Sequence, residues 1–251
     1  MKFLAALQFL TSIPVPWRPE TSPQDLERSA TYFPIVGLII GLIIAGLNSL
    51  FRLILPLEVS NVLLLVSMVA LTGALHLDGF VDTCDGAAGH QTVADRWRIM
   101  HDSRAGAFGI IGVVLLLLVK YIALNNIPAP LMMTTLIFMP VVSRWAMVYA
   151  IFVYRYARPS GLGQALKRGT RWPGFTVATL TTLVIAVVLI PLIGLTGVAV
   201  MIGVWLVTVI LAAYLKSKFS GLTGDTYGAI NEVAEVSVLI IIILLSHLGM
   251  A

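Results

Sequence analysis

Charged residues are scarce in this chain of 251 residues. They make up 11% of the sequence, whereas a soluble domain carries roughly 25%. Hydrophobic residues account for 59%, and the mean hydropathy is +0.97. This composition excludes an ordinary soluble domain and is typical of a protein embedded in a membrane.

Cysteine and several common catalytic motifs are missing as well. The single cysteine, Cys84, cannot form an internal disulfide, so no oxidising compartment is implied. The chain has no Gly-x-x-x-x-Gly-Lys-Ser/Thr loop, no Gly-x-Ser-x-Gly elbow and no His-Glu-x-x-His pair. P-loop nucleotide hydrolysis, serine-elbow acyl transfer and zinc proteolysis therefore lack their signatures. No repeat, low-complexity segment or long linker divides the chain, which predicts one domain over residues 1–251.

Long apolar runs dominate what is present. A membrane-spanning helix needs about 20 consecutive apolar residues. Pro191, Gly194 and Gly197 divide the longest apolar stretch into two runs. The fold is predicted as an all-α, polytopic membrane bundle of about seven transmembrane helices, near 32–55, 59–77, 106–125, 131–153, 174–194, 197–215 and 235–249.

The distribution of basic residues predicts the orientation. The formal net charge is +4, and with seven spans most Lys and Arg residues fall in 1–31, 78–105, 154–173 and 216–234. The opposite loops contain none. Basic loops stay on the cytoplasmic side, so we expect a cytoplasmic N-terminus. Nucleic-acid binding is disfavoured because the basic residues are spread among apolar runs. Residues 1–16 are predicted to form a short helix in the membrane interface rather than a signal peptide.

The acidic residues are concentrated instead of scattered. Eight of the twelve lie in 78–102 and 225–235. Asp78, Asp82 and Asp85 stand at i, i+4 and i+7, which places them on one face of a helix, where like charges repel. A divalent cation with a preference for oxygen ligands, Mg²⁺ above all, would resolve the conflict. The alternative is a helix end with three solvated aspartates. His76, two positions before the first aspartate, is either a catalytic base or a structural histidine.

The segment 96–109 has the features of a phosphate-binding site. Asp102 and Ser103 are good helix-capping residues, Asp102 could add a fourth metal ligand, and Gly106 allows close approach to a helix start. The alternative is an ordinary helix cap with cytoplasmic arginines. The predicted substrate-binding residues of this segment are Arg96, Arg98, Ser103, Arg104 and Gly106, with Arg104 and the helix start expected to bind phosphate.

Two further sites are predicted to contact substrate. In the Gly-rich and Thr-rich segment 221–235, Asp225, Asn231 and Glu232 are expected to shape a ligand pocket, although acidic residues also stabilise a helix N-terminus. Arg144 lies inside the fourth apolar run. A charge at that depth either faces a cavity, where it could bind a substrate phosphate, or pairs with an acidic neighbour.

Several blocks of this sequence resemble the cobalamin synthase family, whose members are adenosylcobinamide-GDP ribazoletransferases. The blocks are HLDGFVDTCDG (76–86), IMHDSRAGAFG (99–109) and GLTGDTYGAINE (221–232), with FLTSIP (9–14), YFPIVG (32–37) and Ser143-Arg144 as further matches. One block departs from the family pattern, because Arg98 directly precedes Ile99 where an acidic residue is usual. It therefore stays open whether Arg96 or Arg98 contacts the ligand.

The resemblance implies an Mg²⁺-dependent transferase of the bacterial inner membrane with its active site facing the cytoplasm. It would transfer the cobinamide-phosphate part of adenosylcobinamide-GDP to α-ribazole or its 5′-phosphate and release GMP, late in cobalamin biosynthesis. Asp82, Asp85 and His76 would be catalytic, and Asp78, Asp82, Asp85 and Asp102 would hold the metal. Oligomers are possible. The alternatives are a CDP-alcohol-type phosphotransferase, whose Ala-Arg is absent after Asp85-Gly86, and a secondary transporter, which would be expected to show internal repeats.

Overall fold

The computed structural model describes residues 1–14, 23–89, 92–102, 104–194 and 196–250. Within these ranges the regular structure is helical, and the only β-type pairing is an isolated bridge between Tyr156 and Leu222. The prediction of Ser103 as a substrate contact lies outside the described residues. The single-domain prediction for 1–251 stays a prediction.

The predicted membrane bundle is confirmed. Six described helices are long and apolar enough to cross a membrane, and the number is seven if one bent helix pair counts as a single span. The long helices are α3 (Phe33–Arg52, preceded by the 3-10 turn η1, Ser29–Tyr32), α7 (Ala107–Asn126), α8 (Ala129–Val153), α10 (Trp172–Ile193), α11 (Thr196–Phe219) and α12 (Gly224–His247). The bent pair is α4 (Leu57–Thr72) with α5 (Leu75–Ala87).

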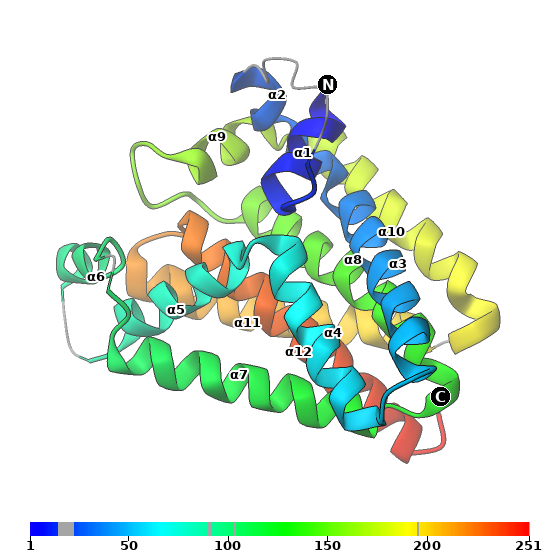
Figure 1. Ribbon diagram of the computed structural model, residues 1–251. Helices are drawn as coiled ribbons and strands as arrows, with labels where there is room; N and C mark the ends of the chain where they lie inside the picture. Colours follow the sequence, from blue (N-terminus) through cyan, green and yellow to red (C-terminus); the bar gives the residue numbers. More distant parts are fainter. Residues whose placement is uncertain (15–22, 90–91, 103, 195, 251) are drawn as a thin grey trace.

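Helix α8 forms the centre of the bundle and packs against α3, α10, α11 and α12 (Figure 1). Its most apolar window is 78% buried, far more than that of the other spans. Gly37 and Gly41 of α3 let the two backbones touch, because a side chain at either position would collide with the backbone of α8 at Pro140 or Ile137. The termini lie at opposite ends of the bundle (Figure 1).

The second predicted span, 59–77, ends earlier than its apolar composition suggests. Helix α4 stops at Thr72, and both Gly73 (φ 58°) and Ala74 (φ 57°) adopt the left-handed conformation. Such residues terminate helices, and the chain turns by 92° into α5. The predicted helical face of Asp78, Asp82 and Asp85 is thus formed, but on a separate helix.

The last span also differs from its predicted bounds of 235–249. Helix α12 begins at Gly224, where Thr223 and Thr226 form a capping box. The polar residues before 235 do not delay the helix because the protein interior supplies partners for them, as described below.

Four short helices surround one end of the bundle, at the left and top of Figure 1. They are α1 (Lys2–Leu10), α2 (Pro23–Glu27), α6 (Val93–Ile99) and α9 (Leu162–Gly169). The short N-terminal helix expected from the sequence is therefore present as α1. Its predicted place in the membrane interface stays a prediction.

Candidate functional site

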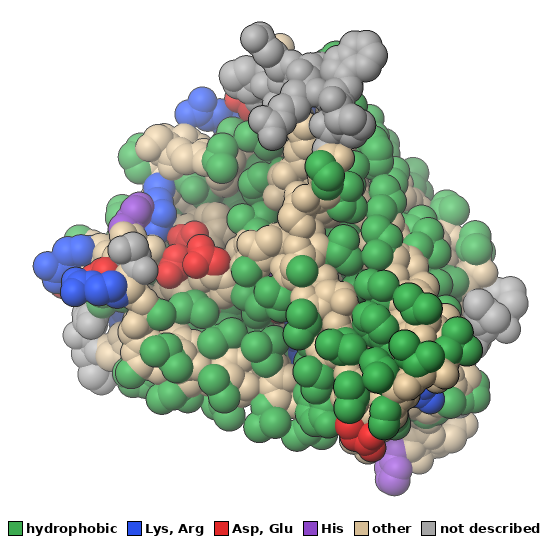
Figure 2. Space-filling view, viewed as in Figure 1, with side chains coloured by type: hydrophobic (Ala, Val, Ile, Leu, Met, Phe, Trp, Pro, Cys, Tyr) green, Lys and Arg blue, Asp and Glu red, His purple; other side chains and the backbone are tan. Residues whose placement is uncertain are grey.

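A cavity of about 570 Å³ opens at this end of the bundle, between α5, α6, α9 and the start of α12. Its polar lining includes His76, Asp78, His101, Arg158, Asp225 and Tyr227. Figure 2 shows acidic side chains gathered in a hollow on this side, next to basic and histidine side chains. Each of the three strongest sequence blocks thus supplies residues to one cavity, the 99–109 block through His101 alone, and the segment 156–166 supplies much of the remaining lining.

The acidic cluster is built by two helices that touch. Gly79 of α5 packs directly on the backbone of Asp225, since a Cβ at Gly79 would lie 2.8 Å from the Asp225 carbonyl oxygen. This contact brings Asp225, in the first turn of α12, next to the aspartates of α5. The carboxylate of the half-buried Asp82 is repelled by those of Asp225, Asp78 and Asp85. The cluster therefore concentrates negative charge beside the cavity.

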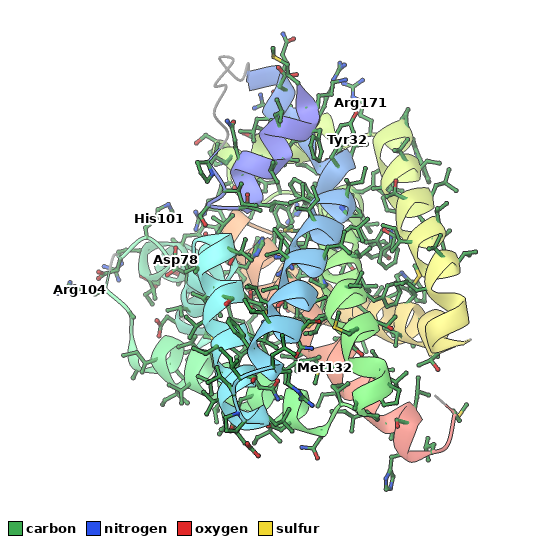
Figure 3. The ribbon with its side chains drawn as sticks, turned by 45° about the vertical axis from the view of Figure 1, so that its right-hand side comes forward. Tyr32, Asp78, His101, Arg104, Met132 and Arg171 are labelled. Carbon is green, nitrogen blue, oxygen red and sulfur yellow. The ribbon has the colours of Figure 1, made fainter. Side chains whose placement is uncertain are left out.

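A basic group faces this cluster across the cavity. Arg158 Nη2 lies 3.4 Å from Asp225 Oδ2, and Arg158 Nη1 lies 3.3 Å from His101 Nε2. His101 Nδ1 is 2.7 Å from the carbonyl of Trp97, so the proton belongs on Nδ1 and Nε2 accepts from Arg158. Asp78 and His101 lie on the same side of the molecule, whereas Arg104 lies farther out (Figure 3). Arg158 was not predicted, because the sequence marks it only as one of several cytoplasmic arginines.

Asp85 has a different role from its neighbours. Its two carboxylate oxygens accept hydrogen bonds from the backbone N–H groups of Gly106 and Gly109, both at 2.8 Å. The N-cap of α7 is Gly106, so the prediction that Asp102 caps this helix is wrong. The N–H groups expected to bind phosphate already bind Asp85, which holds α5 against α7.

Asp102 and Arg104 pair with each other at the surface. Arg104 Nε lies 3.2 Å from Asp102 Oδ1, and the guanidinium holds the pKa of the Asp102 carboxyl below its usual range. Together with Asp85 and Gly106 they line a separate cavity of about 340 Å³. The structure therefore does not bring Asp102, Arg104 or Gly106 into the larger cavity.

Arg96 and Arg98 both have partners away from the acidic cluster. The buried Arg96 donates to the carbonyls of Gly86 (2.7 Å) and Gly89 (2.8 Å) and so fixes the connection between α5 and α6. The exposed Arg98 pairs with Asp95 at 3.2 Å. Their predicted contact with substrate stays a prediction.

A buried ionic network lies deeper in the bundle. Arg144 pairs with Glu235, and Lys120 Nζ lies 2.6 Å from Glu232 Oε2 and 2.7 Å from Glu235 Oε2. Asn231 Nδ2 adds a bond of 3.3 Å to Glu235 Oε1. The two cations balance the two carboxylates, so Arg144 does pair with an acidic neighbour, and its predicted contact with a substrate phosphate stays a prediction. The network contains three residues predicted to contact substrate, Arg144, Asn231 and Glu232. Its fourth member beside Glu235, Lys120, was not predicted as a site residue, although the sequence shows it as a lone charge in an apolar run.

His76 stands between this network and the cavity. It is 2% exposed, and neither ring nitrogen has a hydrogen-bond partner in the described structure. An unpaired buried polar group is costly, so both ring nitrogens are available to a ligand of the cavity, and the predicted catalytic role of His76 stays a prediction.

The acidic cluster fits a magnesium ion by the chemistry of its donors. Among the described residues no group of three or more His, Cys, Asp or Glu side chains converges as a metal site. The predicted set of Asp78, Asp82, Asp85 and Asp102 is therefore not assembled around one point. Mg²⁺, however, uses only one or two protein carboxylates and takes waters and phosphates for the rest. Asp78 and Asp82, with Asp225 opposite, provide such donors together with an excess of negative charge.

Comparisons with known proteins give the same family as the sequence blocks. The family described as cobalamin-5-phosphate synthase matches residues 2–243. A protein of Geotalea daltonii named adenosylcobinamide-GDP ribazoletransferase is 37% identical over 93% of this chain and 93% of its own length. Proteins of the same name from Desulforamulus reducens (36% identity, 95% and 94% covered) and a Roseiflexus species (37%, 92% and 85%) are similarly close. No solved structure matches the chain. Since the match extends over nearly the whole length, the chain belongs to the cobalamin-5-phosphate synthase family.

Proposed function

We propose that the protein is an adenosylcobinamide-GDP ribazoletransferase that joins the cobinamide-phosphate group to α-ribazole or its 5′-phosphate and releases GMP. The observation that carries the proposal is the convergence of the 76–86, 99–109 and 221–232 blocks on the cavity that Asp78, His101, Arg158 and Asp225 line. Relatives that share these blocks over nearly their full length bear this name.

The reaction is a displacement at phosphorus. The ribazole hydroxyl oxygen forms a bond to the cobinamide-side phosphorus, the bond from that phosphorus to the bridging oxygen breaks, and GMP departs with the bridging oxygen. The hydroxyl proton passes to a carboxylate oxygen of Asp78 or Asp82. Chemistry of this kind depends chiefly on positioning and on neutralising charge.

The residues of the cavity and of the adjoining acidic cluster suit these tasks. Arg158, held by Asp225 and by His101, presents a guanidinium to phosphate oxygens. Asp78 and Asp82 would hold Mg²⁺, which when bound neutralises the charge of the diphosphate and of the departing GMP. His76 would contact the substrate from the buried wall of the cavity.

The proposal includes an orientation. The cavity lies at the end of the bundle that carries the basic loops, where Arg158, Lys167 and Arg171 are found. By the positive-inside tendency this end faces the cytoplasm of a bacterial inner membrane. Water-soluble substrates would then reach the cavity from the cytoplasm.

Detergent-purified protein supplied with Mg²⁺, adenosylcobinamide-GDP and α-ribazole should release GMP and form adenosylcobalamin, both measured by chromatography. Removal of divalent cations with EDTA should stop the release, and added Mg²⁺ should restore it. Protein that is folded and monodisperse but releases no GMP with any divalent cation would contradict the proposed reaction. GMP release that continues in EDTA would contradict only the metal assignment.

A further inference from the structure

The large cavity contains more unpaired buried polar groups than its acidic cluster explains. Tyr227 Oη, Trp97 Nε1, Arg158 Nε and both ring nitrogens of His76 are buried and have no hydrogen-bond partner in the described structure. All four side chains line the same cavity. Buried polar groups in folded proteins are nearly always paired, so each of these groups is available to a bound ligand, which need not pair with all of them.

The lining of the cavity also changes from exposed and charged at its mouth to buried and largely apolar at its inner end. Asp78 at the mouth is exposed, whereas Met147, Leu166 and Tyr227 are 2–3% exposed. The ring of Tyr227 lies 6.2 Å from that of Tyr156, at an angle of 36°. The inner part therefore offers apolar and aromatic walls with a few hydrogen-bonding groups, which suits a flat heterocycle.

The next step rests on the proposed function, which supplies three candidate occupants. The corrin ring with its side chains is several times larger than a nucleoside and does not fit a cavity of about 570 Å³. Guanine is polar along its edges, with the acceptors O6 and N7 and the donors N1–H and the amino group, whereas Met147 and Leu166 at the inner end of the cavity are apolar. The dimethylbenzimidazole of α-ribazole has two methyl groups, no donor and a single acceptor, its unsubstituted ring nitrogen.

We propose that the inner cavity is the binding site for the benzimidazole base of ribazole and that Tyr227 Oη donates a hydrogen bond to its unsubstituted ring nitrogen. Met147 and Leu166 supply the apolar floor against the methyl groups. The ribose then points toward Asp78 at the mouth, where its hydroxyl meets the acidic cluster. Tyr227 is thus a specificity-determining residue for the acceptor substrate.

The test measures binding directly by calorimetry, with purified full-length protein, without adenosylcobinamide-GDP. Tyr227→Phe removes one hydroxyl, and we expect the Kd for α-ribazole to rise roughly tenfold, the effect of one lost hydrogen bond. Tyr154→Phe is the matched control, because Tyr154 Oη donates to the carbonyl of Val209 at 3.2 Å and does not line the cavity. Its Kd should equal that of the unmodified protein.

An analogue with an indole in place of the benzimidazole isolates the proposed bond, since it lacks the acceptor nitrogen. The unmodified protein should bind it roughly tenfold more weakly than α-ribazole, and Tyr227→Phe should bind the two equally. Equal binding of both ligands by the unmodified protein would overturn the proposal even if the variant did not fold. A Tyr227→Phe protein with an unchanged Kd for α-ribazole but a raised KM for adenosylcobinamide-GDP would assign the cavity to guanine instead. If either of these binding results is found while the unmodified protein releases GMP at its normal rate, only the proposed base-binding site is refuted. If the unmodified protein releases no GMP, the proposed function itself is refuted.

Discussion

Asp82 and Asp85 lie one helical turn apart on α5, yet their carboxylates have different surroundings. Both oxygens of Asp85 accept backbone hydrogen bonds from the start of α7, while Asp82 lies among the like charges of Asp78, Asp85 and Asp225. A carboxylate kept among like charges costs stability, which is typical of a functional site. We therefore propose that Asp82 takes part in the chemistry and that Asp85 has a positioning role.

Asp82→Asn should lower the rate of GMP release by about 100-fold or more, because it removes a charge that the reaction uses. The measurement is GMP formation at saturating substrates and Mg²⁺. Asp95→Asn is the control. Asp95 lies at the same end of the bundle, but its carboxylate is at the surface, where it accepts a hydrogen bond from Thr92 and pairs with Arg98. An Asp82→Asn protein with near-normal turnover would refute the assignment.

Asp85→Ala should act mainly on stability. It leaves the Gly106 and Gly109 N–H groups without their acceptor, a loss of about 1 kcal/mol by analogy with helix caps. Asp82→Ala relieves repulsion and should leave thermal stability unchanged or higher. Thermal unfolding in detergent compares the two, and a larger loss in Asp82→Ala would contradict this division of roles.

At the scale of helices, the site depends on the close contact of α5 with α12. Gly79→Ala would place a methyl group against the Asp225 backbone and force the helices apart. We expect a destabilisation of about 1–3 kcal/mol together with a loss of turnover. Gly46→Ala on α3 is the control, since a Cβ at Gly46 would have no neighbouring atom within 4 Å. Thermal unfolding and GMP release report the two effects, and equal behaviour of the two variants would show that the contact is not needed.

The buried ionic network connects α7, α8 and α12. Lys120→Met leaves Glu232 buried without its cation and should cost about 3–5 kcal/mol. The double variant Lys120→Met/Glu232→Gln removes one charge of each sign, so it should be more stable than Lys120→Met alone. Unfolding temperatures of the two single variants and the double variant form the test, in which additive losses would contradict a direct pairing.

The sequence predicts where the helices lie along the chain better than it predicts how they pack against one another. Apolar length alone identifies the spans, because a lipid environment leaves few alternatives to a helix. It does not reveal the turn at Gly73 and Ala74, since their left-handed backbone depends on tertiary contacts. The sequence shows that Asp85 is one of several clustered acidic residues. For the same reason it does not show that Asp85 accepts a hydrogen bond from the backbone of Gly106, 21 residues away, at the start of α7. The partnership of Arg158 with Asp225 likewise needs the fold, because nothing in the spacing links residues 67 positions apart.

At the scale of the whole molecule, the distribution of charge predicts how the protein sits in the cell membrane. Arg171 lies at the top of the molecule in Figure 3, and α7 runs from the side of α6 toward the opposite end of the bundle (Figure 1), where its last residue, Asn126, is exposed. In intact cells of a Cys84→Ser background, a membrane-impermeant maleimide should label Asn126→Cys and spare Arg171→Cys until the cells are opened. The reverse pattern would place the active site on the outside.

The bend after α4 has a consequence for the surrounding lipid. Helix α4 by itself has 16 residues and extends only about 24 Å, less than the roughly 30 Å of a hydrocarbon core, and α5 continues it at an angle of 92°. The bilayer beside this short helix must become thinner to avoid hydrophobic mismatch. This thinning brings the lipid headgroups closer to the carboxylates of α5. Turnover of protein reconstituted in short-chain phospholipids should therefore exceed turnover in long-chain ones, and the acyl length of the host membrane becomes part of what sets the rate.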